Sequence, residues 1–140
     1  MVSQEASLLD SVRSAYARVS RGDANALLNA FSEDCVCHIP GNNALAGDYQ
    51  LIDIIQYLNR LWEETRGTLR IQTHDVLANQ EHVVVLQHVT ADRNGSRFDS
   101  RSVLVGHVRN ADKICEVWLF SEAPDEGDQS WLLVPSYRFT

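Results

Sequence analysis

The sequence predicts an α+β fold in which helices pack on one face of a curved antiparallel sheet. Apolar residues recur mainly at helical spacing before Gly67, whereas from Thr68 onward the hydrophobic pattern alternates with a period of two. Helices followed by a run of strands are typical of this class. Strand–helix–strand alternation, the glycine-rich dinucleotide pattern and the P-loop pattern are absent from the sequence, which argues against a parallel nucleotide-binding sheet.

Two helices are expected at the start of the chain. A first amphipathic helix should extend to about Ser20, and Arg21-Gly22 ends it. Asp23 is a suitable N-cap for a short second helix. The residues that this second helix should bury are Leu27, Leu28 and Phe31.

A strand and a long helix follow. Cys35–Ile39 is predicted as a strand because polar and apolar residues alternate before Pro40-Gly41. A loop leads to Asp48, which is expected to be the N-cap of the long helix. Gly67 ends that helix as a C-terminal glycine. Its wide apolar stripe is Leu51, Ile54, Ile55, Leu58, Leu61 and Trp62.

Four strands complete the fold, and one turn fixes the pairing of the middle two. The predicted strands are Thr68–Leu77, His82–Ala91, Arg97–Val108 and Lys113–Ser121. Asn94-Gly95 is the strongest hairpin signal in the chain. With that turn, Val85 pairs with Leu104, Val89 with Ser100, Gln87 with Ser102, His88 with Arg101 and His82 with His107. The register of the strand with His74 and Asp75 stays open, because Asn79-Gln80-Glu81 allows two pairings.

The hairpin assigns residues to the two faces of the sheet. One face should hold Val83, Val85, Gln87, Val89, Phe98, Ser100, Ser102 and Leu104. An apolar face with a few small polar groups lines either a core or a small-molecule pocket. The other face mixes Val84, Leu86, Val103 and Val105 with histidines, Asp99 and Arg101. That mixture suits a half-exposed surface or a subunit interface, and we expect a homodimer.

Composition limits the classes of partner. The net charge is −7, with 12 Lys and Arg against 19 Asp and Glu, so we expect no binding to nucleic acid or anionic lipid. No apolar run approaches the ~20 residues of a membrane span, and the acidic start is unlike a signal peptide. Cys35, Cys37 and Cys115 form no disulfide or zinc motif, so we expect buried thiols in a reducing cytoplasm.

The order and spacing of several short motifs resemble the SnoaL-like family. These motifs are the GD of RGDANALL, the H-x-P-G and A-G-D-Y of HIPGNNALAGDY, the NG turn, and K-I-x-E-x-W of KICEVW. The family belongs to the nuclear transport factor 2-like superfamily, with ketosteroid isomerase and limonene epoxide hydrolase. The likeness covers roughly residues 8 to 121. It implies a cone-shaped sheet wrapped around N-terminal helices, an apolar cavity and, commonly, dimers.

The resemblance also implies where the catalytic groups of known members would fall, and those positions lack them. The isomerase base falls on Ile39, its tyrosine beside Tyr16 and its protonated aspartate near Leu104. The hydrolase Arg-x-Asp pair falls on Val85 and Gln87. The cyclase acid and the hydrolase's third catalytic aspartate fall near Leu119, whose face stays open because a one-residue slip in RNADK reverses it.

His38 and Tyr16 are the remaining candidates for proton handling. Imidazole titrates near neutrality, although the simpler role for His38 is that of a strand-end residue bonded to loop backbone, turned away from the cavity by its alternation with Cys37 and Ile39. Tyr16 lies on an apolar helical stripe, where a core role is the simpler one. The candidate substrate-binding residues are Gln87, Ser100, Ser102, Tyr49 and Trp62, with packing as the simpler role for Trp62. The five histidines lack metal-ligand spacing, so no metal or cofactor is predicted.

Two functions follow from these residues. The first is an isomerase or cyclase that acts by acid–base chemistry on a small apolar or aromatic molecule in the cavity. The second is a non-catalytic dimer that binds an apolar ligand or serves as an assembly subunit. Residues 1–122 form the predicted single domain, and residues 123–140 form a tail. We expect the tail's Trp131–Val134 to dock over the cavity mouth or against the partner subunit.

Overall fold

The computed structural model describes residues 4–40 and 45–122, with side chains from residue 7. The tail after residue 122, including its predicted docking residues, lies outside the described part. The helices are α1 (Gln4–Val19), the 3-10 helix η1 (Ala24–Asn29) and α2 (Leu51–Glu64). The strands are β1 (Phe31–Ile39), β2 (Gly47–Gln50), β3 (Arg70–Ala78), β4 (His82–Arg93), β5 (Ser96–Arg109) and β6 (Lys113–Ser121).

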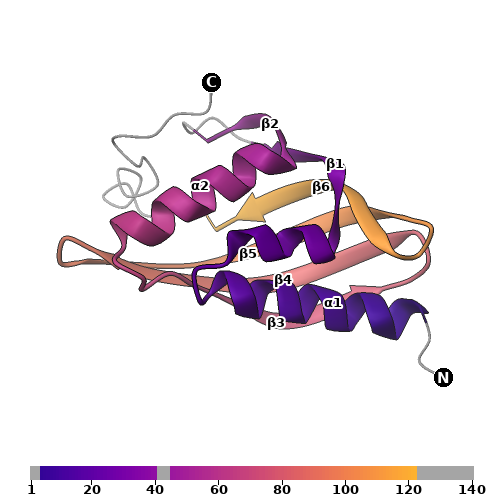
Figure 1. Ribbon diagram of the computed structural model, residues 1–140, viewed down its shortest axis with the longest axis horizontal. Coiled ribbons are helices and arrows are strands. Elements are labelled where there is room, and N and C mark those ends of the chain that lie inside the picture. Colours follow the sequence, from indigo (N-terminus) through magenta and orange to yellow (C-terminus); the bar gives the residue numbers. More distant parts are fainter. Residues whose placement is uncertain (1–3, 41–44, 123–140) are drawn as a thin grey trace.

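The strands form one curved, unclosed sheet in the order β2-β1-β6-β5-β4-β3. The helices lie together over one face of this sheet, with α1 in front of β3 and β4 (Figure 1). This arrangement confirms the predicted α+β class. Four neighbouring pairs are antiparallel, and three of them form the predicted meander of β3, β4, β5 and β6, whereas β1 and β6 run parallel. Among the described residues, no helix combines the length and apolarity needed to cross a bilayer.

The predicted β4–β5 hairpin is confirmed residue by residue. Val85 lies opposite Leu104, Gln87 opposite Ser102 and His88 opposite Arg101. Asn94 and Gly95 form the turn with φ angles of 50° and 82°, which is the left-handed geometry that a two-residue hairpin turn requires. Because side chains alternate along a strand, this register assigns every β4 and β5 residue to a face.

Two bulges explain what the sequence left open. Thr73 pairs with Gln87 and Asp75 with Leu86, so His74 is the extra residue of a bulge in β3. A second irregularity lies between His107 and Val108 on β5. A β-bulge inserts one residue without changing the strand order, and hydrophobic alternation alone does not locate it.

Several expectations around the first turns are wrong. Leu28 is 42% exposed, because η1 is a 3-10 helix with three residues per turn and presents Leu27 to the core instead. Asp23 is the N-cap residue of η1, as predicted, but its side chain makes no capping hydrogen bond, because its carboxylate accepts hydrogen bonds from Arg18. Phe31 is buried, as predicted, but it begins β1 rather than extending η1.

The start of α2 also differs from the prediction. Residues 47–50 pair with β1 as strand β2, so the helix begins at Leu51 and Asp48 is not its N-cap. Gln50 is the N-cap, and Asp53 accepts a hydrogen bond from its backbone N–H at 3.0 Å. This reciprocal capping box satisfies N–H groups that the first turn leaves unpaired.

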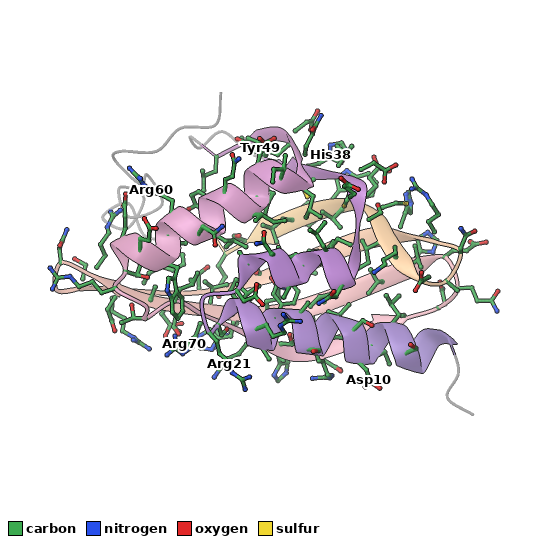
Figure 2. All side chains as sticks on the ribbon, in the orientation of Figure 1. Asp10, Arg21, His38, Tyr49, Arg60 and Arg70 are labelled. Atoms are coloured by element: carbon green, nitrogen blue, oxygen red, sulfur yellow. The ribbon has the colours of Figure 1, made fainter. Side chains whose placement is uncertain are left out.

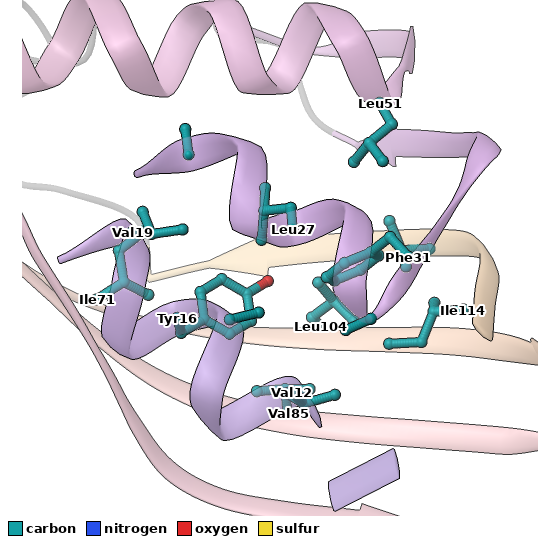
Figure 3. Packing of buried hydrophobic residues seen from close by; sticks show 14 of the residues in the cluster. Val12, Tyr16, Val19, Leu27, Phe31, Leu51, Ile71, Val85, Leu104 and Ile114 are labelled. Atoms are coloured by element: carbon teal, nitrogen blue, oxygen red, sulfur yellow. The ribbon is translucent and has the colours of Figure 1, made fainter. Parts of the chain in front are cut away.

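The core lies between the helices and the inner face of the sheet. Tyr16 and Val19 of α1, Leu27 of η1 and Phe31 of β1 meet there with Leu104 of β5 (Figure 3). A backbone turn closes the end of α2, which stops at Glu64. Gly67, with φ of 75°, ends the turn after the helix, and its N–H donates to Trp62 O at 2.9 Å.

Candidate functional site

An apolar cavity of about 180 Å³ lies between the helices and the inner face of the sheet. It is smaller than the ~300–1,000 Å³ of drug-sized pockets, so it fits a compact ligand. No charged or imidazole side chain belongs to its described lining. The apolar residues that line it include Leu27, Phe31, Leu51, Leu58, Leu61, Ile71, Leu104 and Leu119.

Four of the predicted site residues come together in this cavity. Tyr16 reaches it from α1, Gln87 from β4, and Ser100 and Ser102 from β5. All four are buried. Figure 3 shows the Tyr16 side chain among the core residues between helix and sheet. The β4–β5 register therefore builds a small polar patch on an otherwise apolar wall.

Hydrogen bonds within this patch leave one donor unused. Ser102 Oγ donates to Gln87 Oε1 at 3.2 Å, and Ser100 Oγ donates to the Arg101 carbonyl. Gln87 Nε2 is buried and makes no hydrogen bond within the described part of the chain. Leaving a buried amide N–H unpaired costs about 1–3 kcal/mol. The site thus holds a donor that an acceptor atom on a ligand would satisfy.

Tyr16 contributes a neutral hydroxyl. Burial raises the pKa of Tyr16 well above its usual value, and the nearby Gln87 amide lowers it to a smaller extent, although their separation lies outside hydrogen-bonding geometry. The phenol therefore stays protonated at physiological pH. A protonated phenol donates a hydrogen bond, and it transfers its proton fully only to a strong base.

The positions at which the resemblance implies carboxyl groups are apolar and face this cavity. Ile39, Leu104 and Leu119 all belong to the lining. The face of Leu119, which the sequence left open, is now fixed, because Leu119 pairs with Leu104 beyond a bulge in which Cys115 of β6 is the extra residue. The inner face therefore supplies hydrogen-bonding groups without a carboxylate.

His38 lies on the opposite, outer face of the sheet. Alternation along β1 turns Cys37 and Ile39 inward and His38 outward. Its Nδ1 is 2.6 Å from Asp48 Oδ1, and its Nε2 is 2.8 Å from Glu116 Oε2. Its ring also stacks on Trp118, with centroids 5.1 Å apart.

These contacts shift the pKa values of His38 and Glu116. Hydrogen bonds to Asp48 and then to Glu116 raise the pKa of His38. The bond from His38, assisted by His107, lowers the pKa of Glu116. The two carboxylates therefore favour the protonated form of the His38 imidazole on this half-exposed surface. His38 is thus bonded to side chains rather than to loop backbone.

The other two predicted binding residues lie outside the cavity lining. Tyr49 donates its hydroxyl to the Leu45 carbonyl at 2.8 Å, and Figure 2 shows Tyr49 near His38 at the end of the sheet. Trp62 packs close to Gly22 and Gly67, and the Arg70 guanidinium lies 5.8 Å from its ring centroid. Their roles in substrate binding stay predictions.

Sequence reasoning missed several residues of the cavity wall, Cys37 and Tyr57 among them. Alternation from Cys35 would have found the first, because i and i+2 share a strand face. Cys35 and Cys37 are buried, as expected, whereas Cys115 is half exposed. Within the described residues no group of histidine, cysteine, aspartate and glutamate has the geometry to hold a metal ion.

Comparison with known proteins places this geometry in a family. The family model of the SnoaL-like domain matches residues 12–117. The chain belongs to the SnoaL-like family. The uncharacterized protein Rv0034 of Mycobacterium tuberculosis is 31% identical over 125 residues, covering 88% of this chain and 95% of its own.

Solved structures of SnoaL-like and cystatin-fold proteins share the fold. Bal32a, from a soil-derived mobile gene cassette, has a TM-score of 0.71 at 26% identity over 85% of this chain and 92% of its own. A Xanthomonas campestris protein with a cystatin-like fold has a TM-score of 0.69 at 25% identity, covering 89% and 97%. IdmH of Streptomyces antibioticus, a candidate polyketide cyclase, shares the fold alone, with a TM-score of 0.67 at 16% identity over 87% and 96%.

The outer imidazole predicts a pH-dependent contribution to stability. A raised folded-state pKa means that the His38 contribution is fully present below the unfolded value of about 6.5 and is lost as pH rises through the folded pKa. The lowered pKa of Glu116 means that the pairing is also lost in strong acid. In thermal melts, the melting temperature of His38→Gln should lie further below that of wild type near pH 6 than near pH 9.

His82→Gln is the matched control, because His82 contacts the His107 ring on the same face. The loss of melting temperature in His82→Gln should depend less on pH than the loss in His38→Gln. If the loss of melting temperature in His38→Gln is independent of pH, His38 does not form ion pairs with Asp48 and Glu116 that stabilise the fold.

The apolar wall at Leu119 generates a second prediction. A carboxylate in Leu119→Asp would be desolvated, so its pKa should rise above the reference of about 3.9. Because ionisation is then easier in the unfolded chain, the mutant should lose stability as pH rises from that reference through the folded pKa. An upward shift of about two pH units corresponds to roughly 3 kcal/mol.

Leu28→Asp is the control, since Leu28 is 42% exposed on η1 and lies outside both the cavity lining and the outer face of the sheet. Thermal melts should show that the melting temperature of Leu119→Asp, relative to wild type, is lower near pH 7 than near pH 3.5, and that the control does not change in this way. Equal pH dependence in the two variants would show that the position is not desolvated.

Proposed function

We propose that this protein is a cofactor-independent isomerase or cyclase for a compact, apolar carbonyl compound. The observation that carries the proposal is the apolar cavity with a neutral polar patch at Tyr16, Gln87 and Ser102. The carbonyl oxygen would accept hydrogen bonds from the Tyr16 hydroxyl and from Gln87 Nε2. Membership of the SnoaL-like family supports this role.

The proposed chemistry uses two effects of such a site. Donors aimed at a carbonyl oxygen stabilise the negative charge that develops there when a proton leaves the neighbouring carbon. Enclosing walls hold a flexible substrate in a reactive conformation. His38 has no place in this scheme, because it lies outside the lining and is engaged by Asp48 and Glu116.

A second function, binding of an apolar ligand without catalysis, is supported by one observation. Ile39, Leu104 and Leu119 stand where the resemblance implies carboxyl groups, and all three face the cavity as apolar residues. A site that lacks a strong base binds a carbonyl compound without removing a proton from it. The test therefore has to measure binding and proton removal separately.

Cyclohexanone and methylcyclohexane provide that test, because they differ mainly in the carbonyl group. Wild type should bind cyclohexanone about tenfold more tightly, as measured by NMR titration, since one well-placed hydrogen bond contributes about 1 kcal/mol or more. Tyr16→Phe and Gln87→Leu should each reduce this preference while leaving methylcyclohexane binding unchanged. Exchange of the α-hydrogens of cyclohexanone in D₂O then reports proton removal.

Accelerated exchange in wild type, lowered about 10²-fold or more by Tyr16→Phe, would support the enzyme. Binding without accelerated exchange would favour the non-catalytic ligand-binding function. If wild type shows no preference for the ketone, the role of Tyr16 and Gln87 is wrong in both functions.

We further propose that the outer face of the sheet pairs two copies of the chain. Val84 lies opposite Val105, and Leu86 lies opposite Val103, with exposed Phe120 next to Val103. These half-buried apolar residues lie among His and Arg side chains, as in many subunit interfaces. Sedimentation in dilute buffer should give about twice the 15.8 kDa chain mass.

Leu86→Glu should shift the protein toward the monomer, because a like-charged pair would face across the interface. Leu28→Glu, on exposed η1, is the control and should leave the mass unchanged. A clean wild-type monomer at micromolar concentration would contradict the proposal.

A further inference from the structure

Two cysteines of β1 point toward the interior. Cys35 and Cys37 share the inner face because they are two residues apart on a strand. Cys37 is 6% exposed and belongs to the cavity lining, whereas Cys35 is completely buried and does not. Cys37 is held on both sides, since it pairs with Tyr49 of β2 and with Val117 of β6. A rigid strand therefore presents one thiol to the cavity.

The same cavity contains a donor that lacks a partner. Gln87 lines the wall, is 6% exposed, and its Nε2 makes no hydrogen bond within the described residues. Its amide lies beside the Tyr16 hydroxyl. An unpaired buried N–H favours a ligand that carries an acceptor atom, and the apolar walls favour a ligand that is otherwise hydrocarbon.

The two thiols are not equivalent. Cys35 Sγ donates to the Val36 carbonyl at 3.8 Å. The interaction between the two thiols raises the pKa of Cys35 and lowers the pKa of Cys37, although burial opposes the second effect. The thiolate is the reactive form of cysteine. Of the two, Cys37 is thus the sulfur that both reaches the cavity and more readily becomes a nucleophile.

We propose that Cys37 is a nucleophile that captures α,β-unsaturated carbonyl compounds in the cavity by conjugate addition. This inference rests on the carbonyl-binding role proposed for Tyr16 and Gln87. The Cys37 sulfur forms a bond to the β-carbon, and the π electrons of the C=C bond move toward the carbonyl oxygen, where the two donors stabilise the charge. The thiol proton ends on the α-carbon, so the addition has no leaving group and needs no oxidant or reductant.

The test uses 2-cyclohexenone on the full chain carrying Cys115→Ser, which removes the half-exposed thiol. Intact mass should increase by the whole mass of one enone, and peptide mapping should locate the adduct on Cys37. Cyclohexanone, which binds but cannot add, should slow the reaction at least ~10-fold at saturation. Gln87→Leu should slow it about 3- to 10-fold, corresponding to one lost hydrogen bond.

Two further variants in the same background complete the design. Cys37→Ser should abolish the adduct, whereas Cys35→Ser should retain it. Protein unfolded in urea is the control for reagent activity, because both remaining thiols then react. Mapping on the protein with both β1 cysteines intact does not depend on whether either serine variant folds.

Several outcomes would overturn the inference. These are an adduct on Cys35, an unmodified Cys37 in folded protein while the unfolded chain reacts, and modification of Cys37 that cyclohexanone does not slow. If cyclohexanone binds with the expected preference but Cys37 stays unmodified, only the covalent step is wrong. If cyclohexanone does not bind, the proposed function fails together with the inference.

Discussion

The parallel pairing of β1 with β6 is the contact on which the rest of this structure depends. It joins the N-terminal half of the chain to the β3–β6 meander, with Cys37 beside Val117 and His38 beside Trp118. Parallel strands need a long connection between them, and here that connection includes α2 and the four strands β2 to β5. The pairing gives the helices a continuous sheet face to cover. The cavity forms between these two layers, and the alternation of β1 decides which side chains enter it.

Alternation on this sheet separates charged from neutral groups. The outer face holds His38, Asp48 and Glu116 in contact with one another and partly in water. The inner face holds Tyr16 and Gln87, which carry no charge. An ionised group in an apolar cavity is costly unless it is paired, whereas burying a neutral amide or phenol costs far less. The neutral character of the site is therefore consistent with its depth in the fold.

The sequence predicted what depends on local rules. Asn94-Gly95 fixed the register of β4 and β5, and that register correctly placed Gln87, Ser100 and Ser102 on the inner face. Contacts between segments that are far apart in the chain could not be predicted from local patterns. The parallel contact between β1 and β6 leaves no local pattern, and neither does strand β2, whose residues were assigned to a loop and a helix start. The carboxylate partners of His38 come from these two unpredicted pairings, so its environment was unpredictable as well.

The cavity should select ligands by their hydrogen-bonding groups as well as by their size. A hydrocarbon and a ketone of equal volume bury similar apolar surface against walls such as Leu58 and Leu104. Only the ketone offers an acceptor to Gln87 Nε2, which is already desolvated before binding. A site with a buried, unpaired donor rejects ligands that cannot pair with it, because the donor's lost hydration is not replaced. Discrimination by this mechanism requires that Gln87 be held in place, which the Ser102 hydrogen bond and the β4–β5 register both do.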